Sequence, residues 1–188
     1  MKVEMKRIVV VVLIAMICVT GFGQDTSKER PPLSERLFFG GSFGLQFGTI
    51  TNIEASPVIG LWVLPRVAVA AGPSYQYYKD PVDATAIYGG KAYLQITLIQ
   101  DLNNIIPIGI NTGIFVQSEY QGLSLERSFW SLVPDGNGRI YMGTFLAGAG
   151  ISQPIGRRSN MNFTVLWALT DTQYQVYDSP EIRISFNF

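Results

Sequence analysis

The feature that most constrains this chain is an alternation of apolar with small or polar residues, repeated in eight segments between residues 37 and 188. A period of two places every second side chain on the same face of an extended strand, whereas a helix repeats every 3.6 residues. In residues 37–49, for example, Phe39 and Phe43 fall on one face, and Ser42 and Gly44 on the other. No stretch in this region has the 18 consecutive apolar residues of a membrane-spanning helix. The pattern predicts an all-β fold.

We predict eight strands, separated by segments rich in Gly, Pro, Asp and Asn. Only the sixth is ambiguous in phase, because two sets of residues compete for its apolar face. We favour the set that contains Tyr141 and Phe145 over the set that contains Met142 and Leu146. The predicted strands cover residues 37–49, 53–64, 67–78, 87–99, 108–119, 139–152, 161–170 and 181–188.

The polar faces decide which side of such a sheet meets water. A soluble barrel needs an exterior rich in charge, but these faces carry mostly Gly, Ser, Thr, Asn and Gln, and the chain is 47% apolar and only 15% charged. The apolar faces carry no charge, as lipid contact requires, because one Arg or Lys near the bilayer midplane costs about 2–4 kcal/mol. Strands of about 9 to 13 residues also suit a tilted crossing of the hydrocarbon layer. We predict an eight-stranded antiparallel up-and-down transmembrane β-barrel with its apolar faces outside.

The connections and the aromatic residues follow from this topology. Residues 65–66, 101–107 and 153–159 form the short set, and residues 79–86, 120–138 and 171–180 the longer set, while 49–52 is short where a long loop is expected. Pro57 and Pro73 each remove a ladder hydrogen bond, so we expect a bulge or an interfacial position there. Two aromatic girdles are expected, one near each membrane interface: Tyr75, Tyr77, Tyr78, Tyr88 and Tyr141 near the outer interface, and Phe39, Trp62, Phe186 and Phe188 near the inner one.

The first 23 residues have the pattern of a cleaved secretory signal peptide. Basic residues precede an apolar run over residues 8–19, and Gly21-Phe22-Gly23 follows it. The run is too short to favour a permanent helical anchor. Lipidation at Cys18 is disfavoured, because Met16-Ile17 lacks the small residue that processing needs. Residues 24–36 are polar and contain Pro31-Pro32, which predicts a flexible periplasmic leader, and residues 37–188 form the barrel domain.

No cysteine or histidine follows residue 23. This excludes disulfides, thiolate nucleophiles, imidazole bases and Cys/His metal sites from the mature chain, so we expect no cofactor and no metal. Residues 1–23 hold three of the 14 basic and one of the 14 acidic residues, which leaves the rest with a net charge of −2. That charge does not indicate a nucleic-acid partner.

The carboxy-terminal segment ends in an aromatic residue with apolar residues at alternate positions before it: Ile182, Ile184, Phe186 and Phe188. Together with the signal peptide, this segment makes residues 37–188 resemble the small eight-stranded outer-membrane β-barrel proteins of Gram-negative bacteria, the class that includes the OmpA transmembrane domain and OmpX. The resemblance implies that the terminus is a signal read by the barrel-assembly machinery. It also implies insertion into the outer membrane, with both chain ends in the periplasm.

Four charged residues fall on the inward faces: Glu54, Lys91, Glu119 and Arg183. They are compatible with a gated polar pore, but we favour a self-satisfied network that plugs the lumen. Buried charges persist when they are paired, and the interior of an eight-stranded barrel is filled by its own side chains. Glu54 and Glu119 as an acid/base pair are a weaker alternative. We expect no enzymatic activity and assign no catalytic residue.

The longest predicted loop, residues 120–138, is unusually apolar. Phe129 and Trp130 are the candidates for anchoring a partner there. The alternative, which we favour, is that the loop extends the barrel wall, folds over its mouth or dips into the membrane interface.

The expected function is that of a non-enzymatic outer-membrane protein. It contributes to envelope integrity or presents its loops to an envelope or extracellular protein. One alternative is a narrow porin-like barrel for small polar solutes, and a second is a soluble periplasmic lipid-binding barrel. Outer-membrane lipids and, during insertion, the barrel-assembly machinery are the expected partners.

Overall fold

The computed structural model describes residues 31–46, 51–107, 109, 111–130, 138–170 and 180–188. The chain divides into two compact units, residues 1–32 and 33–188, and the second unit contains all of the strands. The predicted signal peptide, Cys18 and most of the predicted leader lie outside the described residues. Of the leader, residues 33–36 form a one-turn helix, from which Arg36 donates hydrogen bonds to the carbonyls of Trp62 (2.7 Å) and Val63 (3.1 Å).

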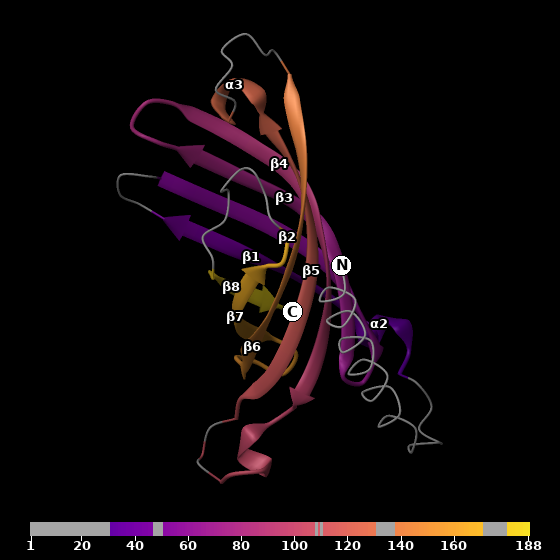
Figure 1. Cartoon of the computed structure of the whole chain (residues 1–188). Helices are drawn as coiled ribbons and strands as arrows, with labels where there is room; N and C mark the ends of the chain where they lie inside the picture. Colours follow the sequence, from indigo (N-terminus) through magenta and orange to yellow (C-terminus); the bar gives the residue numbers. More distant parts are fainter. Residues whose placement is uncertain (1–30, 47–50, 108, 110, 131–137, 171–179) are drawn as a thin grey trace, which may run out of the picture. The chain divides into compact units, whose positions relative to one another are not determined.

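Eight antiparallel strands close into a barrel in sequence order, and the last pairs with the first (Figure 1). This confirms the predicted fold class. No helix among the described residues is long and apolar enough to cross a membrane. The elements are α2 (Leu33–Arg36), β1 (Leu37–Gln46), β2 (Thr51–Leu64), β3 (Val67–Lys79), β4 (Ala84–Ile99), η1 (Leu102–Asn104), β5 (Gly113–Glu126), α3 (Arg127–Trp130), β6 (Arg139–Pro154), β7 (Asn160–Ala168) and β8 (Glu181–Asn187).

The barrel has two ends, which we call the terminus end and the loop end. The terminus end holds the start of β1, the end of β8 and the connections 65–66, 100–112 and 155–159. The loop end holds the other connections, from β1 to β2, β3 to β4, β5 to β6 and β7 to β8.

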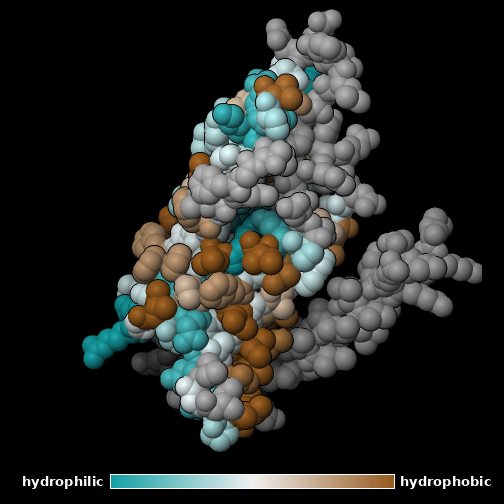
Figure 2. All heavy atoms as spheres, turned by 90° about the vertical axis from the view of Figure 1, so that its left-hand side faces the viewer, coloured by the Kyte–Doolittle hydropathy of each residue, from teal (hydrophilic) through white to brown (hydrophobic). Residues whose placement is uncertain are grey.

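The alternation of the sequence becomes an outward and an inward face. Apolar side chains such as Phe43, Leu94 and Trp167 are exposed on the outside, whereas Ser42, Gln95 and Leu166 point inward and are buried. In β6, Tyr141 and Phe145 are exposed while Met142 and Leu146 are buried, so the favoured phase is confirmed. Figure 2 shows hydrophobic side chains gathered in patches on one face of this outer surface.

The fifth strand differs most from its prediction. It begins at Gly113 rather than near residue 108 and continues to Glu126, so Leu123 and Leu125 belong to the wall and not to a loop. The pairing with β4 and β6 continues along it, and the buried Leu123 and Leu125 fill the lumen. The connection before it spans residues 100–112, which makes the terminus end less uniform in its turns than expected.

Pro57 and Pro73 cause no bulge. The β2–β3 register is the same on both sides of them, from Ala55 opposite Tyr75 to Ile59 opposite Ala71, so the two prolines lie opposite each other. Two residues that lack an N–H group therefore interrupt the ladder at a single place. The register shift in this pair lies instead between Trp62 and Leu64.

The seam between β1 and β8 closes the barrel with a short ladder, from Gly40 opposite Asn187 to Phe43 opposite Ile184. Two backbone hydrogen bonds extend it at the terminus end: the N–H of Phe39 to the carbonyl of Phe188 (3.1 Å) and the reverse bond (2.7 Å).

Inside the barrel, polar side chains lie between two apolar clusters. The cluster at the loop end contains Ile87, Leu123, Leu125 and Met142, with Tyr78 packed against it. The cluster at the terminus end contains Phe38, Val58, Ala68 and Ala70, with Trp62 and Tyr93 against it. Tyr78 and Trp62 thus line the lumen, and their assignment to the girdles was wrong because their position along the strand turns them inward.

Glycine makes room for the ring of Phe38 at the terminus end. A Cβ atom built on Gly60 lies 2.0 Å from the Cζ atom of Phe38, so only glycine fits under that ring.

Candidate functional site: a polar network across the lumen

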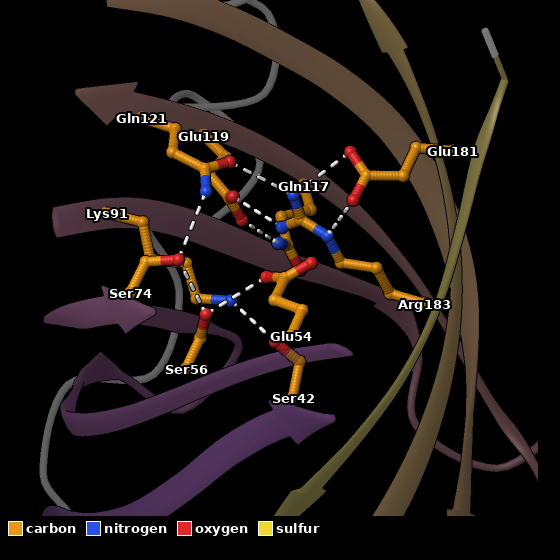
Figure 3. Close-up of polar contacts among 10 residues, drawn as sticks. All are labelled: Ser42, Glu54, Ser56, Ser74, Lys91, Gln117, Glu119, Gln121, Glu181 and Arg183. Atoms are coloured by element: carbon orange, nitrogen blue, oxygen red, sulfur yellow. Dashed lines mark hydrogen bonds and ion pairs between the residues drawn. The ribbon is translucent and has the colours of Figure 1, made fainter. Parts of the chain in front are cut away.

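Arg183 of β8 is the centre of the polar layer. Its guanidinium binds Glu181 through Nε (2.6 Å) and Nη2 (3.0 Å) and Glu119 through Nη1 (2.5 Å). Nη2 also donates to Oε1 of Gln121 at 3.1 Å. Glu119 is only 1% exposed and Arg183 8%, so this is a buried ion pair with its hydrogen bonds satisfied on both sides. Figure 3 shows the side chains converging from opposite walls.

The network continues from Gln121 to the far side of the barrel. The amide of Gln121 donates to Ser74 (3.4 Å), Ser74 and Ser56 share a hydrogen bond (2.9 Å), and Ser56 donates to Glu54 (2.9 Å). The path therefore links β8, β5, β3 and β2 (Figure 3). Because it joins strands that are not neighbours in the sheet, it fixes the barrel cross-section in a way that the backbone ladders do not.

Lys91 makes a second cross-link. Its Nζ donates to Oγ of Ser42 at 2.6 Å, which ties β4 to β1 across the lumen. On the other side, Gln117 donates to Oε2 of Glu119 at 3.0 Å and completes the coordination of that carboxylate.

The structure thus brings Glu119 and Arg183 together, joins Glu54 to them through intervening side chains, and places Lys91 on Ser42. The sequence prediction missed Glu181, although the alternation of β8 gives it the same face as Arg183. With Glu181 included, the described residues of this layer carry three carboxylates and two cationic groups: Glu54, Glu119, Glu181, Lys91 and Arg183. It also missed Ser42, Ser56 and Ser74 as members, because a small hydroxyl on a strand carries no signal of its own.

Little space is left around this network. A cavity of about 20 Å³ lies beside Lys91, Glu119 and Arg183, and its other walls include Tyr93 and Asn187. A cavity needs roughly 10–15 Å³ to hold one water molecule, so there is room for about one. The cavity therefore gives no room for a solute larger than water.

The chemistry of the layer is that of structural pairing. Glu54 and Glu119 are separated in the network by Ser56, Ser74, Gln121 and Arg183, so no direct acid/base contact joins them. Within the described ranges, no cluster of three or more His, Cys, Asp or Glu side chains is arranged to hold a metal ion.

The two loop candidates lie in α3, at the loop end. The Phe129 ring is partly buried and meets Tyr78 edge-on, with 5.8 Å between ring centroids. This contact places Phe129 on a side chain that packs against the apolar cluster of the loop end. Trp130 ends the helix, and its side chain is outside the described part.

The residues of the terminal motif lie on the outer face of β8 and directly after it. Ile182, Ile184 and Phe188 are exposed, whereas Phe186 is partly exposed and pairs with Gly41 and Met161. Their side chains are directed to the surroundings of the barrel, and the strand they form closes it.

Comparison with protein-family models and with curated proteins finds no match to this chain. Among solved structures, the crystal structure of the N-terminal β-barrel domain of Pseudomonas aeruginosa OprF is similar, with a TM-score of 0.47 and 14% sequence identity. The alignment covers 81% of this chain and 94% of that one. The closed pairing of the eight strands by itself defines the fold of this chain.

Proposed function

We propose that this chain is a non-enzymatic outer-membrane β-barrel protein whose lumen is closed by the Arg183 network. One observation carries the proposal: the outward face of the described strands is free of charge except at the loop end. At the loop end, the charged residues on the outward face of the described strands are Lys79, Glu126 and Arg139. Each is the first or last residue of its strand. Such a band suits a hydrocarbon layer flanked by an aqueous boundary.

The alternative of a soluble periplasmic lipid-binding barrel fits this distribution poorly. A soluble barrel turns its apolar faces inward around a ligand, yet Phe39 (61%) and Ile59 (58%) are exposed on the outside. The inside is occupied by the polar network, and the cavity of about 20 Å³ leaves no space for a lipid tail.

Cell fractionation tests the membrane location. We expect the mature chain in the outer-membrane fraction, with faster gel migration before heating than after, as a folded barrel retains its compact form in detergent. Recovery of the mature chain in the soluble periplasm would contradict the proposal and support the soluble alternative.

For the physiological role, we propose a contribution to envelope integrity in preference to capture of a partner by the loop. The contact of Phe129 with Tyr78 supports this, because a ring packed against its own barrel is not available as an anchor for another protein. A photo-crosslinker at Trp130 in intact cells tests it. Lipid adducts alone would agree with this role, whereas a discrete protein adduct would establish a loop partner.

The narrow porin-like barrel remains the second candidate, and the conductance experiment in the Discussion separates it from a closed lumen. We further propose that the barrel-assembly machinery recognises β8 during insertion, on the basis of the alternating apolar residues of its outer face.

A further inference from the structure

Arg139 lies on the outer face of the barrel, where its side chain crosses three strands. It starts β6, and its Nε donates to Oγ of Ser124 on β5 at 2.7 Å. Its Nη2 donates to the carbonyls of Ser124 (2.5 Å) and Ala86 (2.9 Å), the latter on β4. The guanidinium carbon stands 4.1 Å from the ring centroid of Tyr88. The cation is therefore held in one place by hydrogen bonds and by the aromatic face.

In the part of the chain that the structure describes, no carboxylate forms an ion pair with Arg139. Glu126 stands opposite Arg139 in the β5–β6 register, but its oxygens accept from Thr85 (2.9 Å) and Ser128 (3.2 Å) instead. Among the described residues, Nη1 of Arg139 has no hydrogen-bond partner, and the side chain is only partly buried. The two N–H groups of Nη1 can therefore donate hydrogen bonds to an acceptor outside the described residues.

The surroundings indicate what that acceptor is. The strand registers place Tyr75, Tyr88, Ser124 and Tyr141 in one outward row directly beneath Arg139. Tyr75 and Tyr88 stack at 6.1 Å, and Tyr141 is 84% exposed. Tyrosines of this kind occupy the headgroup level of a bilayer, where their rings meet apolar tails and their hydroxyls meet water. An arginine fixed at that level meets phosphate groups, which its planar fork binds well.

On β4, β5 and β6, the next row of outward positions towards the terminus end consists of glycines, which have no side chain to project from the wall. Register pairs bring Gly90, Gly122 and Gly143 side by side beneath the tyrosines, and the row after that contains Tyr120 and Phe145, which pack at 4.9 Å. The ring of Tyr120 covers Gly143, because a Cβ atom built there would lie 2.5 Å from the Tyr120 hydroxyl oxygen. A chain that runs down from Arg139 therefore passes over Gly90 and Gly122, beside the Tyr120 ring. This shape suits an acyl tail attached to the phosphate.

We infer that Arg139 and Tyr88 form a binding site for the headgroup phosphate of an anionic membrane lipid on the outer surface of the barrel. The inference rests on the proposed membrane location. It goes beyond that location, because it assigns one position on the wall that holds a lipid molecule selectively.

Native mass spectrometry of the folded mature chain in detergent, with phosphatidylglycerol or phosphatidylcholine added, tests the site. We expect phosphatidylglycerol to be retained more strongly, because choline compensates the phosphate charge in the other lipid. In Arg139→Gln we expect about tenfold weaker retention of phosphatidylglycerol, the size of one lost charge-assisted contact. The matched control is Arg158→Gln, which removes an exposed arginine from the 155–159 turn at the terminus end.

Equal retention of the two lipids by the parent chain overturns the inference, and this comparison holds even if Arg139→Gln fails to fold. An equal loss in Arg139→Gln and Arg158→Gln also overturns it, because the effect is then one of net charge. Gel migration before and after heating is recorded for each variant in parallel. A parent chain that does not fold as a barrel in detergent contradicts the proposed function itself, whereas a folded barrel without lipid preference contradicts only the site.

Discussion

The guanidinium of Arg183 donates hydrogen bonds to two carboxylates, and it is the cation that compensates the charge of both. Glu119 and Glu181 come from different strands, and the guanidinium fork reaches both while also binding Gln121. A buried carboxylate whose cation is removed carries the full cost of its lost hydration. We therefore expect the substitution of a single residue of this polar layer to lower the stability of the barrel strongly.

Arg183→Gln tests this dependence. We expect the free energy of unfolding to fall by about 3–5 kcal/mol, since the buried Glu119 and the partly buried Glu181 lose their shared cation. Urea titration of the barrel in lipid vesicles, followed by tryptophan fluorescence, measures the loss. Arg157→Gln, on the exposed turn after β6, is the matched control and is expected to change stability by less than about 0.5 kcal/mol. Similar losses in both variants would show that the network does not stabilise the barrel.

At the scale of the strands, much was predictable from local pattern. The alternation fixes which residues of a strand share a face, so the inward positions of Glu54, Lys91, Glu119 and Arg183 and the phase of β6 follow without tertiary information. Strand ends are less predictable, because pairing with a neighbour can extend a strand past the point where the pattern weakens. That is how β5 reaches Glu126 and includes Leu123 and Leu125.

The outer face of β4 provides a test at this scale. Leu94→Arg places a charge among Val69, Ser118 and the other outward residues midway along the wall. We expect a loss of about 2–4 kcal/mol in the free energy of unfolding in vesicles, because the cation enters the hydrocarbon layer. Tyr141→Arg, in the tyrosine row, serves as the control with an expected loss of about 0–1 kcal/mol. A loss for Leu94→Arg no larger than that of the control would argue against lipid contact on this face.

The last strand provides a second test. Phe188→Ala is expected to reduce the amount of barrel in the outer membrane of cells, because it removes the final aromatic residue that the assembly machinery is proposed to read. Phe163→Ala removes another outward-facing phenylalanine, on β7, and is expected to leave that amount unchanged. Refolding of the purified chains in detergent is measured alongside. If both variants reach the outer membrane equally well, the terminal residue is not a recognition signal.

For the whole molecule, the proposed closure of the lumen depends on all layers together. The apolar clusters at the two ends and the network between them fill the interior, and the cavity beside Lys91 has room for about one water molecule. The filling of the lumen cannot be inferred from any single strand. It arises when eight inward faces meet at a fixed stagger.

Planar-bilayer recordings test closure. We expect the parent barrel to insert without a steady current above that of the bare bilayer. The variants Lys91→Ala and Glu119→Ala, one from each cross-link, show whether any current depends on the network. Robust currents in the parent that change in either variant would overturn the closed lumen in favour of the porin-like alternative.

The sequence by itself determined the all-β class, the number of strands, the identity of the two faces and the scarcity of charge on the outer one. These properties are local, because each is read from neighbours two positions apart. The tertiary structure decided which distant residues meet. Ser56 reaches Ser74, Glu181 joins Arg183 with Glu119, and Arg139 crosses β5 to Tyr88 only because the strand registers and the closure of the barrel set their relative heights. A period of two is the same at every register, and so it carries no information about those heights.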